Sequence, residues 1–106
     1  MSKAKREEEI VADMESRKMP IRMQQSVVSY VLHRVPPGHF LTAVMSNNLL
    51  EAIGRADETN YKLLREWVRL FYNCDAIPSE CWGSAEAVEE WLKGQSLMPT
   101  MEKETA

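Results

Sequence analysis

The sequence has little of what secreted, membrane-spanning and nucleotide-hydrolysing proteins require. Its 106 residues include two cysteines and four scattered glycines. Two cysteines do not make a disulfide framework, and isolated glycines do not form a phosphate-binding loop. No apolar run approaches the ~20 residues that cross a bilayer, and the first twenty residues are charged throughout, unlike a signal peptide. We therefore expect a cytoplasmic protein with reduced thiols and no membrane partner.

An excess of positive charge is also absent. Thirteen Lys and Arg residues stand against sixteen Asp and Glu residues, which gives a net charge of −3. A protein held on duplex DNA by its overall field normally carries surplus positive charge. Duplex DNA is therefore not an expected partner.

What the sequence does contain is enough for one globular domain. Apolar residues make up 44 % of the chain and charged residues 27 %, inside the globular range. Residues 1–18 are densely charged, with only Ile10, Val11 and Met14 as an apolar stripe, and predict an arm that is mobile or ordered by a partner. Residues 94–106 have no periodic apolar face and predict a flexible tail. The folded domain is expected over residues 19–93.

Helical periodicity dominates this domain, and no segment shows sustained two-residue alternation. Helices are predicted over about 20–33, over 40–56, from Asp57 as N-cap, and from Ser84 as N-cap to just before Gly94. The polar run at 46–48 leaves open whether 40–56 is one helix or two. The third helix is expected to bury one stripe and expose a basic one. The buried stripe comprises Tyr61, Leu64, Trp67, Val68 and Phe71. The fold class is therefore all-α, a small compact bundle of about four helices.

Catalytic or metal-binding chemistry finds little support. His33 and His39 are six residues apart across a proline turn, and Cys74 and Cys81 flank a loop, whereas zinc ligands usually come in tighter pairs. The cysteines are interpreted as small core residues. We expect no metal, no cofactor and no enzymatic activity.

Binding of an anion is the chemistry that the residues favour. Lys62, Arg65 and Arg69 form the basic stripe of the third helix, and Arg55 lies just before its cap, so all four can donate charge-assisted hydrogen bonds to phosphate. The alternative is that this stripe is only the solvated face of an amphipathic helix. Phe40 and Trp82 lie in loop-like sequence. An aromatic ring in such a position either lines a pocket or, as the alternative, packs under the loop. The predicted ligand-binding residues are His39, Phe40, Arg55, Asn60, Lys62, Arg65, Arg69 and Trp82.

Three short elements carry a resemblance. They are Pro36-Pro37-Gly38, Arg55-Ala56-Asp57 and Cys81-Trp82-Gly83-Ser84. With them, residues 20–93 resemble a family of small uncharacterised proteins encoded by tailed phages and prophages. Accessory phage proteins of this size commonly act against host defence, and the resemblance implies such a role in the host bacterial cytoplasm.

Three functions remain open from the sequence. The first is a homo-oligomeric counter-defence protein that sequesters a small nucleotide signal, such as a cyclic oligonucleotide. The second is an inhibitor of a host defence enzyme, which could use an acidic surface as a nucleic-acid mimic. That surface comprises Glu80, Glu86, Glu89 and Glu90. The third is a structural phage component.

Overall fold

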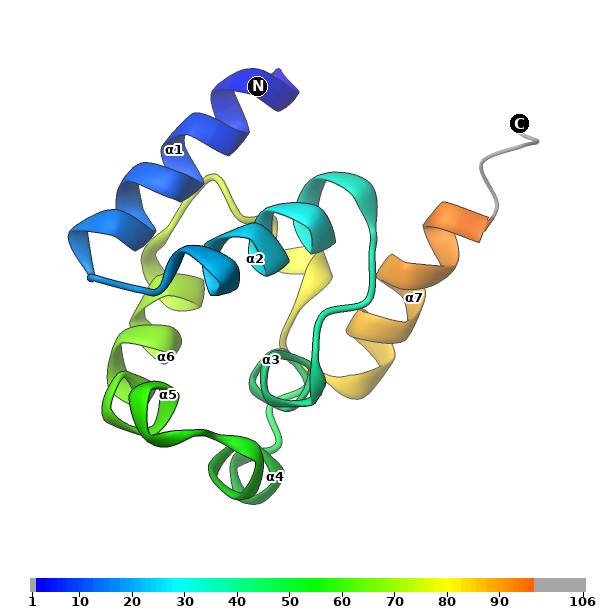
Figure 1. The fold of residues 1–106 in the computed structure, drawn as a ribbon. Helices are drawn as coiled ribbons and strands as arrows, with labels where there is room; N and C mark the ends of the chain where they lie inside the picture. Colours follow the sequence, from blue (N-terminus) through cyan, green and yellow to red (C-terminus); the bar gives the residue numbers. More distant parts are fainter. Residues whose placement is uncertain (1, 97–106) are drawn as a thin grey trace.

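The computed structural model describes residues 2–96, with side chains described for residues 2–94. All regular structure in this part is helical (Figure 1), so the all-α prediction is confirmed. The helices are more numerous and shorter than the four expected. They are α1 (Lys3–Ser16), α2 (Ile21–His33), α3 (His39–Met45), α4 (Leu49–Arg55), α5 (Glu58–Lys62), α6 (Leu64–Asn73), the 3-10 turn η1 (Ser79–Cys81) and α7 (Ala85–Ser96).

Two predicted helices are each divided by a local break. Asn47 adopts a left-handed conformation, with φ of 62°, and the Asn48 side chain accepts from the Glu51 N–H at 3.2 Å. These asparagines end α3 and cap α4, which settles the question left open at 46–48. Leu63 departs from helical geometry, with φ −94° and ψ 7°, and separates α5 from α6.

The N-terminal segment, expected to be an arm separate from a domain that begins at residue 19, packs against the rest of the chain in this structure. Ile10 and Met14 of α1 are both 0 % exposed. Arg17 donates to Asp13 on its own helix and to Glu66 on α6, each at 2.8 Å. The apolar stripe is thin, but its two largest side chains enter the core, and a buried aliphatic side chain contributes about 1.5–3 kcal/mol.

The buried face of α6 differs from the predicted stripe. Trp67 and Phe71 are buried as expected, and Leu70 joins them, whereas Tyr61 is 59 % exposed and Val68 is 53 % exposed. The prediction assumed one continuous helix from residue 57, but the break at Leu63 makes α6 a helix of its own. Its buried face is centred on Trp67, Leu70 and Phe71, which leaves Val68 outside.

The end of the described chain docks on α2. The Ser84 hydroxyl accepts from the Ala87 N–H at 3.0 Å, as predicted for the N-cap of α7. The helix does not end at Gly94 but runs through it to Ser96, and Arg34 lies directly against that glycine. The Arg34 guanidinium also stacks 3.8 Å above the Trp91 ring and donates to the Trp91 carbonyl at 3.1 Å. The remaining predicted tail, residues 97–106, lies outside the described residues.

Within residues 2–96, no helix combines the length and the apolar content that crossing a bilayer requires.

Candidate ligand-binding pocket

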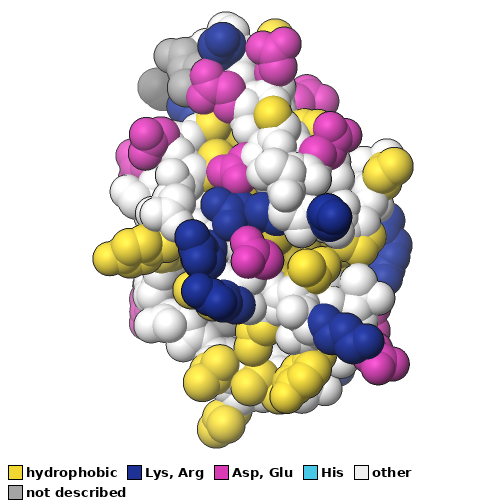
Figure 2. All heavy atoms as spheres, turned by 90° about the vertical axis from the view of Figure 1, so that its left-hand side faces the viewer, with side chains coloured by type: hydrophobic (Ala, Val, Ile, Leu, Met, Phe, Trp, Pro, Cys, Tyr) yellow, Lys and Arg dark blue, Asp and Glu magenta, His cyan; other side chains and the backbone are white. Residues whose placement is uncertain are grey.

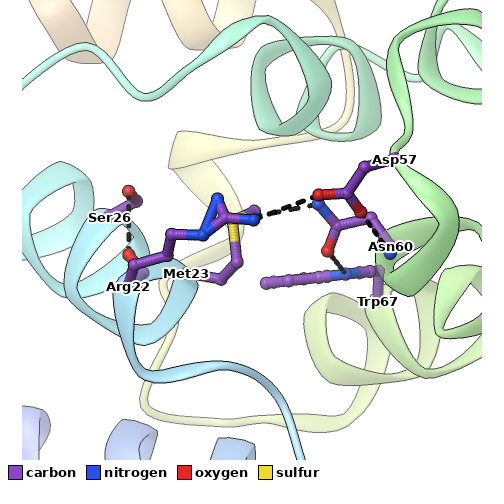
Figure 3. Close-up of polar contacts among 6 residues, drawn as sticks. All are labelled: Arg22, Met23, Ser26, Asp57, Asn60 and Trp67. Atoms are coloured by element: carbon purple, nitrogen blue, oxygen red, sulfur yellow. Dashed lines mark hydrogen bonds and ion pairs between the residues drawn. The ribbon is translucent and has the colours of Figure 1, made fainter.

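A pocket of about 260 Å³ lies where α2, α3 and α5 begin and α4 ends. Four of the eight predicted ligand-binding residues line it, namely His39, Phe40, Arg55 and Asn60. Arg22 of α2 also lines it, and Figure 3 shows this side chain extending from α2 toward Asp57 and Asn60. Residues that are up to 38 positions apart in the sequence therefore meet at one place.

Two turns of the chain build the pocket. The first follows α2, where the Pro36-Pro37-Gly38 turn leads into α3 with Gly38 as its N-cap. The second is Arg55-Ala56-Asp57, where Ala56 is extended, so that α4 ends and Asp57 caps α5. Gly38, Arg55 and Asp57, from two of the three elements that carry the resemblance, thus line the same pocket.

Asp57 is the acidic group of this pocket. Its Oδ1 accepts from the Asn60 N–H at 2.8 Å, and its Oδ2 accepts from Arg22 Nη2 at 3.0 Å. The Asn60 N–H, and then the Arg22 guanidinium, hold the pKa of the Asp57 carboxyl below its ordinary value. Asp57 therefore stays ionised at neutral pH and competes with any anionic ligand for Arg22.

Asn60 forms the floor of the pocket. Its side chain is 4 % exposed, and its Oδ1 accepts from the Trp67 indole N–H at 3.2 Å. The amide nitrogen faces the Met23 sulfur at 3.9 Å (Figure 3). Because both ends of the amide have internal partners, Asn60 shapes the pocket rather than presenting a free donor.

The two aromatic candidates are packed against other rings. Phe40 is 6 % exposed and meets Trp67 edge to face, with centroids 6.0 Å apart. Trp82 lies away from the pocket and packs against Phe71 at 6.2 Å. Its indole N–H is buried without a hydrogen-bond partner among the described residues. Phe40 lies in α3 rather than in a loop, and its ring packs in the core and does not present an open stacking face.

The predicted basic residues divide into two groups. Arg55 lines the pocket, with its Nε donating to Glu51 Oε2 at 2.8 Å. Lys62 faces Glu58 at 3.6 Å on the exposed side of α5, and Arg65 and Arg69 stand exposed on α6, outside the residues that line the pocket. The structure therefore does not bring the basic stripe and Arg55 into one site.

Arg22 is the pocket residue that sequence reasoning missed. It lies in the first turn of α2, 35 residues before its partner Asp57, and no local spacing links the two. Its Ser26 neighbour bonds only within the helix, donating to the Arg22 carbonyl at 3.2 Å. Because Arg22 and Asp57 are far apart in the sequence, their contact depends on how α2 packs against α5.

A larger cleft of about 930 Å³ lies between α1, the end of α2 and α7. It contains cations of α1 and α2, but also Asp75 and Glu80, so its charge is mixed. Arg6 donates to the Ala76 carbonyl at 3.0 Å, and Arg34 is held by Trp91. None of the predicted ligand-binding residues lines this cleft, and its arginines are already used to hold helices together.

No group of three or more His, Cys, Asp or Glu side chains in residues 2–96 is placed to hold a metal ion. Cys74 and Cys81 are buried free thiols, as expected, and burial raises the pKa of Cys81 to about 12. At the pocket, Arg22, Arg55 and His39 line one opening. Arg22 is paired with Asp57, which also lines the pocket, and Arg55 is paired with Glu51, which does not.

Comparison with family models, with curated proteins and with solved structures finds no match to this chain.

Proposed function

We propose that this chain is a non-catalytic binding protein that holds the phosphate group of a small nucleotide in the pocket between α2, α3, α4 and α5. The observation that carries the proposal is the meeting of Arg22, His39 and Arg55 around one opening. Guanidinium groups bind phosphate through paired, charge-assisted hydrogen bonds. The role as a phage counter-defence protein rests on the resemblance and belongs to the same proposal.

Both arginines have carboxylate partners that a phosphate must displace. The Arg22–Asp57 and Arg55–Glu51 pairs have side chains that are 48–67 % exposed. Exposed pairs of this kind are weak. Each pair has a single N–O contact, whereas a phosphate can offer a guanidinium two acceptor oxygens, so a phosphate can compete with the carboxylates for both arginines.

The size of the pocket limits what one copy can enclose. Small-molecule pockets usually measure about 300–1,000 Å³, and 260 Å³ is below that range. A phosphate with part of its sugar fits, but a whole cyclic oligonucleotide does not. A larger nucleotide therefore needs a second copy of the chain to cover the remainder of the ligand, and the homo-oligomer expected from the sequence belongs to this proposal.

Calorimetric titration with cyclic and linear nucleotides, and with inorganic phosphate, tests the proposal. We expect Arg55→Ala to weaken nucleotide binding about ten- to hundredfold, because a charge-assisted hydrogen bond is lost. Glu51→Gln is expected to tighten binding, because it releases Arg55. Arg69→Ala is the matched control, an exposed arginine outside the pocket, and should bind like the wild type.

Two results would count against the proposal. If the wild type binds no nucleotide, the function is wrong. If Arg69→Ala weakens binding as much as Arg55→Ala, the ligand lies on α6 and the pocket is not the site.

A further inference from the structure

Asp57 carries the only carboxylate among the described residues that line the pocket between α2, α3, α4 and α5. Figure 2 shows Lys and Arg side chains next to Asp and Glu side chains at several places on one face of the molecule, so an ion pair does not by itself mark a site. The Arg22–Asp57 pair is distinguished because both of its side chains also line a pocket. A ligand in this pocket therefore meets a carboxylate as well as cations.

The two carboxylate oxygens of Asp57 have different roles. Oδ1 accepts from the Asn60 N–H at 2.8 Å, and this bond caps α5. Oδ2 accepts from Arg22 Nη2 at 3.0 Å, between side chains that are 49 % and 67 % exposed. The cap bond belongs to the fold, whereas an ion pair between exposed side chains is weak. Oδ2 is therefore the oxygen that can exchange its partner.

A phosphate bound to Arg22 would take this partner from Oδ2. The Asp57 carboxylate would then lie beside a second anion, and like charges at short range repel each other. A ligand hydroxyl close to the phosphate offsets this cost, because it can donate a charge-assisted hydrogen bond to Oδ2. Ribose has such a hydroxyl, on the 2′ carbon beside a 3′ phosphate, and deoxyribose does not.

The remaining polar side chains of the pocket have other partners. Ser26 Oγ donates to a carbonyl within α2 at 3.2 Å, and Asn60 Nδ2 lies 3.9 Å from the Met23 sulfur. The two arginines and His39 are the groups that the proposed function assigns to the phosphate. A donor for Asp57 Oδ2 is therefore best supplied by the ligand itself.

We propose that the pocket selects ribonucleotides over deoxyribonucleotides, with Asp57 Oδ2 accepting a hydrogen bond from the sugar hydroxyl next to the carbon that carries the phosphate. A volume of about 260 Å³ holds a phosphate with part of its sugar, so this contact lies within one copy of the chain. The inference rests on the proposed function and names the class of nucleotide that the site takes.

Calorimetric titration with adenosine 3′-monophosphate, 2′-deoxyadenosine 3′-monophosphate and inorganic phosphate tests the selection. We expect the wild type to bind the ribonucleotide about ten- to hundredfold more tightly than the deoxyribonucleotide, because one hydrogen bond to a charged group is gained. Asp57→Ser should bind both nucleotides alike, and should bind inorganic phosphate at least as tightly as the wild type. Serine has a single side-chain oxygen, which retains the cap of α5 and leaves no second oxygen for the sugar.

Two further variants complete the design. Asp57→Asn decides the question if Asp57→Ser fails to fold, since asparagine is an equally good N-cap and places an amide nitrogen where Oδ2 was. We expect it to reduce the preference for ribose as well. Asp75→Asn is the matched control, because Asp75 is an exposed aspartate that does not line the pocket, and it should keep the preference of the wild type.

Several outcomes would overturn the inference. Equal binding of the two nucleotides by the wild type would refute the selection and leave the proposed function standing. The inference is also wrong if Asp57→Ser keeps the preference for ribose, or if Asp75→Asn loses it. Loss of inorganic phosphate binding in the folded Asp57 variants would show that Asp57 only positions Arg22. A wild type that binds neither nucleotide nor phosphate would refute the proposed function, and the inference with it.

Discussion

At the scale of single residues, buried polar groups fix the start of α2 and the junction of α5 with α6. Gln24 and Asn60 are the buried polar side chains of the described chain. Gln24 donates to the Met19 carbonyl at 2.9 Å, and Asn60 accepts from Trp67. A buried polar atom is costly unless it is hydrogen-bonded, so these contacts specify one arrangement of the helices.

Replacing Asn60 tests this arrangement. Asn60→Ala leaves the Trp67 indole N–H without its acceptor in the core, and we expect a loss of about 1–3 kcal/mol in the free energy of unfolding, measured by urea denaturation. Asn73→Ala is the control, because its amide is exposed and donates to a main-chain carbonyl on its own helix, that of Arg69, at 3.0 Å. The control should change stability by less than about 0.5 kcal/mol. Similar small losses in both variants would show that the Asn60–Trp67 bond contributes little.

Arg34 shows a second residue-scale feature, in which an unfavourable backbone conformation is matched by side-chain contacts. Its φ of 56° is left-handed, a conformation that glycine usually supplies at the end of a helix. The guanidinium then lies over Trp91 and against Gly94, where a Cβ would displace it. Gly94 is therefore explained by close approach and not by helix termination.

At the scale of elements, α1 shows how a highly charged helix can belong to a core. One face carries Ile10 and Met14, and its charged residues either face solvent or reach neighbouring segments, as Arg6 does to the Ala76 carbonyl and Arg17 to Glu66. An isolated helix of this composition is marginal in water. Its order comes from packing against α2 and α6.

Truncating the α1 side chains measures that packing. We expect Ile10→Ala to lower the free energy of unfolding by about 2–5 kcal/mol, because a fully buried side chain leaves a cavity. Glu8→Ala, at an exposed position on the same helix, should stay within about 0.5 kcal/mol of the wild type. Chemical denaturation followed by circular dichroism gives both values. An Ile10→Ala variant as stable as the control would mean that residues 1–18 are an arm after all.

At the scale of the whole molecule, long-range contacts join all parts of the described chain. The Tyr30 hydroxyl donates to the Cys81 carbonyl at 2.7 Å, and the Trp91 indole N–H donates to the Tyr30 carbonyl at 2.9 Å. These bonds tie η1 and α7 to α2, while Arg17 ties α1 to α6. Because these hydrogen bonds connect distant parts of one core, we expect the protein to unfold in a single cooperative transition.

Comparing the unfolding curves from two spectroscopic probes tests this cooperativity. Tryptophan fluorescence and far-UV circular dichroism should give the same midpoint and slope on urea titration. Trp91→Phe removes the reporter on α7 and leaves Trp67 and Trp82, which pack against Phe40 and Phe71. If α7 unfolds before the core, the fluorescence change of the wild type will begin at a lower urea concentration than the fluorescence change of Trp91→Phe.

The parts of this fold that were predictable depend on neighbours within about one helical turn. Asp57 and Ser84 act as N-caps as expected, and Trp67 and Phe71 are buried as expected. Caps and the helical period involve residues three or four positions apart, so they can be recognised along the chain. The all-α class follows from the same local signals.

The candidate site was predictable in part for the same reason. His39, Phe40, Arg55 and Asn60 flank two turns, and turn chemistry is local, so four of the eight predicted residues meet at the pocket. Lys62, Arg65 and Arg69 were grouped with them by charge, and charge pattern alone does not place an element in space. Trp82 was grouped by its loop-like setting, and that loop lies elsewhere.

The sequence by itself determined the helical class, the caps and the two turns, because these depend on hydrogen bonds and periodicities of a few residues. Only the tertiary structure decided that α1 enters the core, that Val68 and Tyr61 face outward, and that Arg22 reaches Asp57. Each of these depends on the angle at which one helix packs on another, and that angle results from the shapes of many side chains together. The pocket depends on these packing angles as well, because its lining residues come from several helices and their ends.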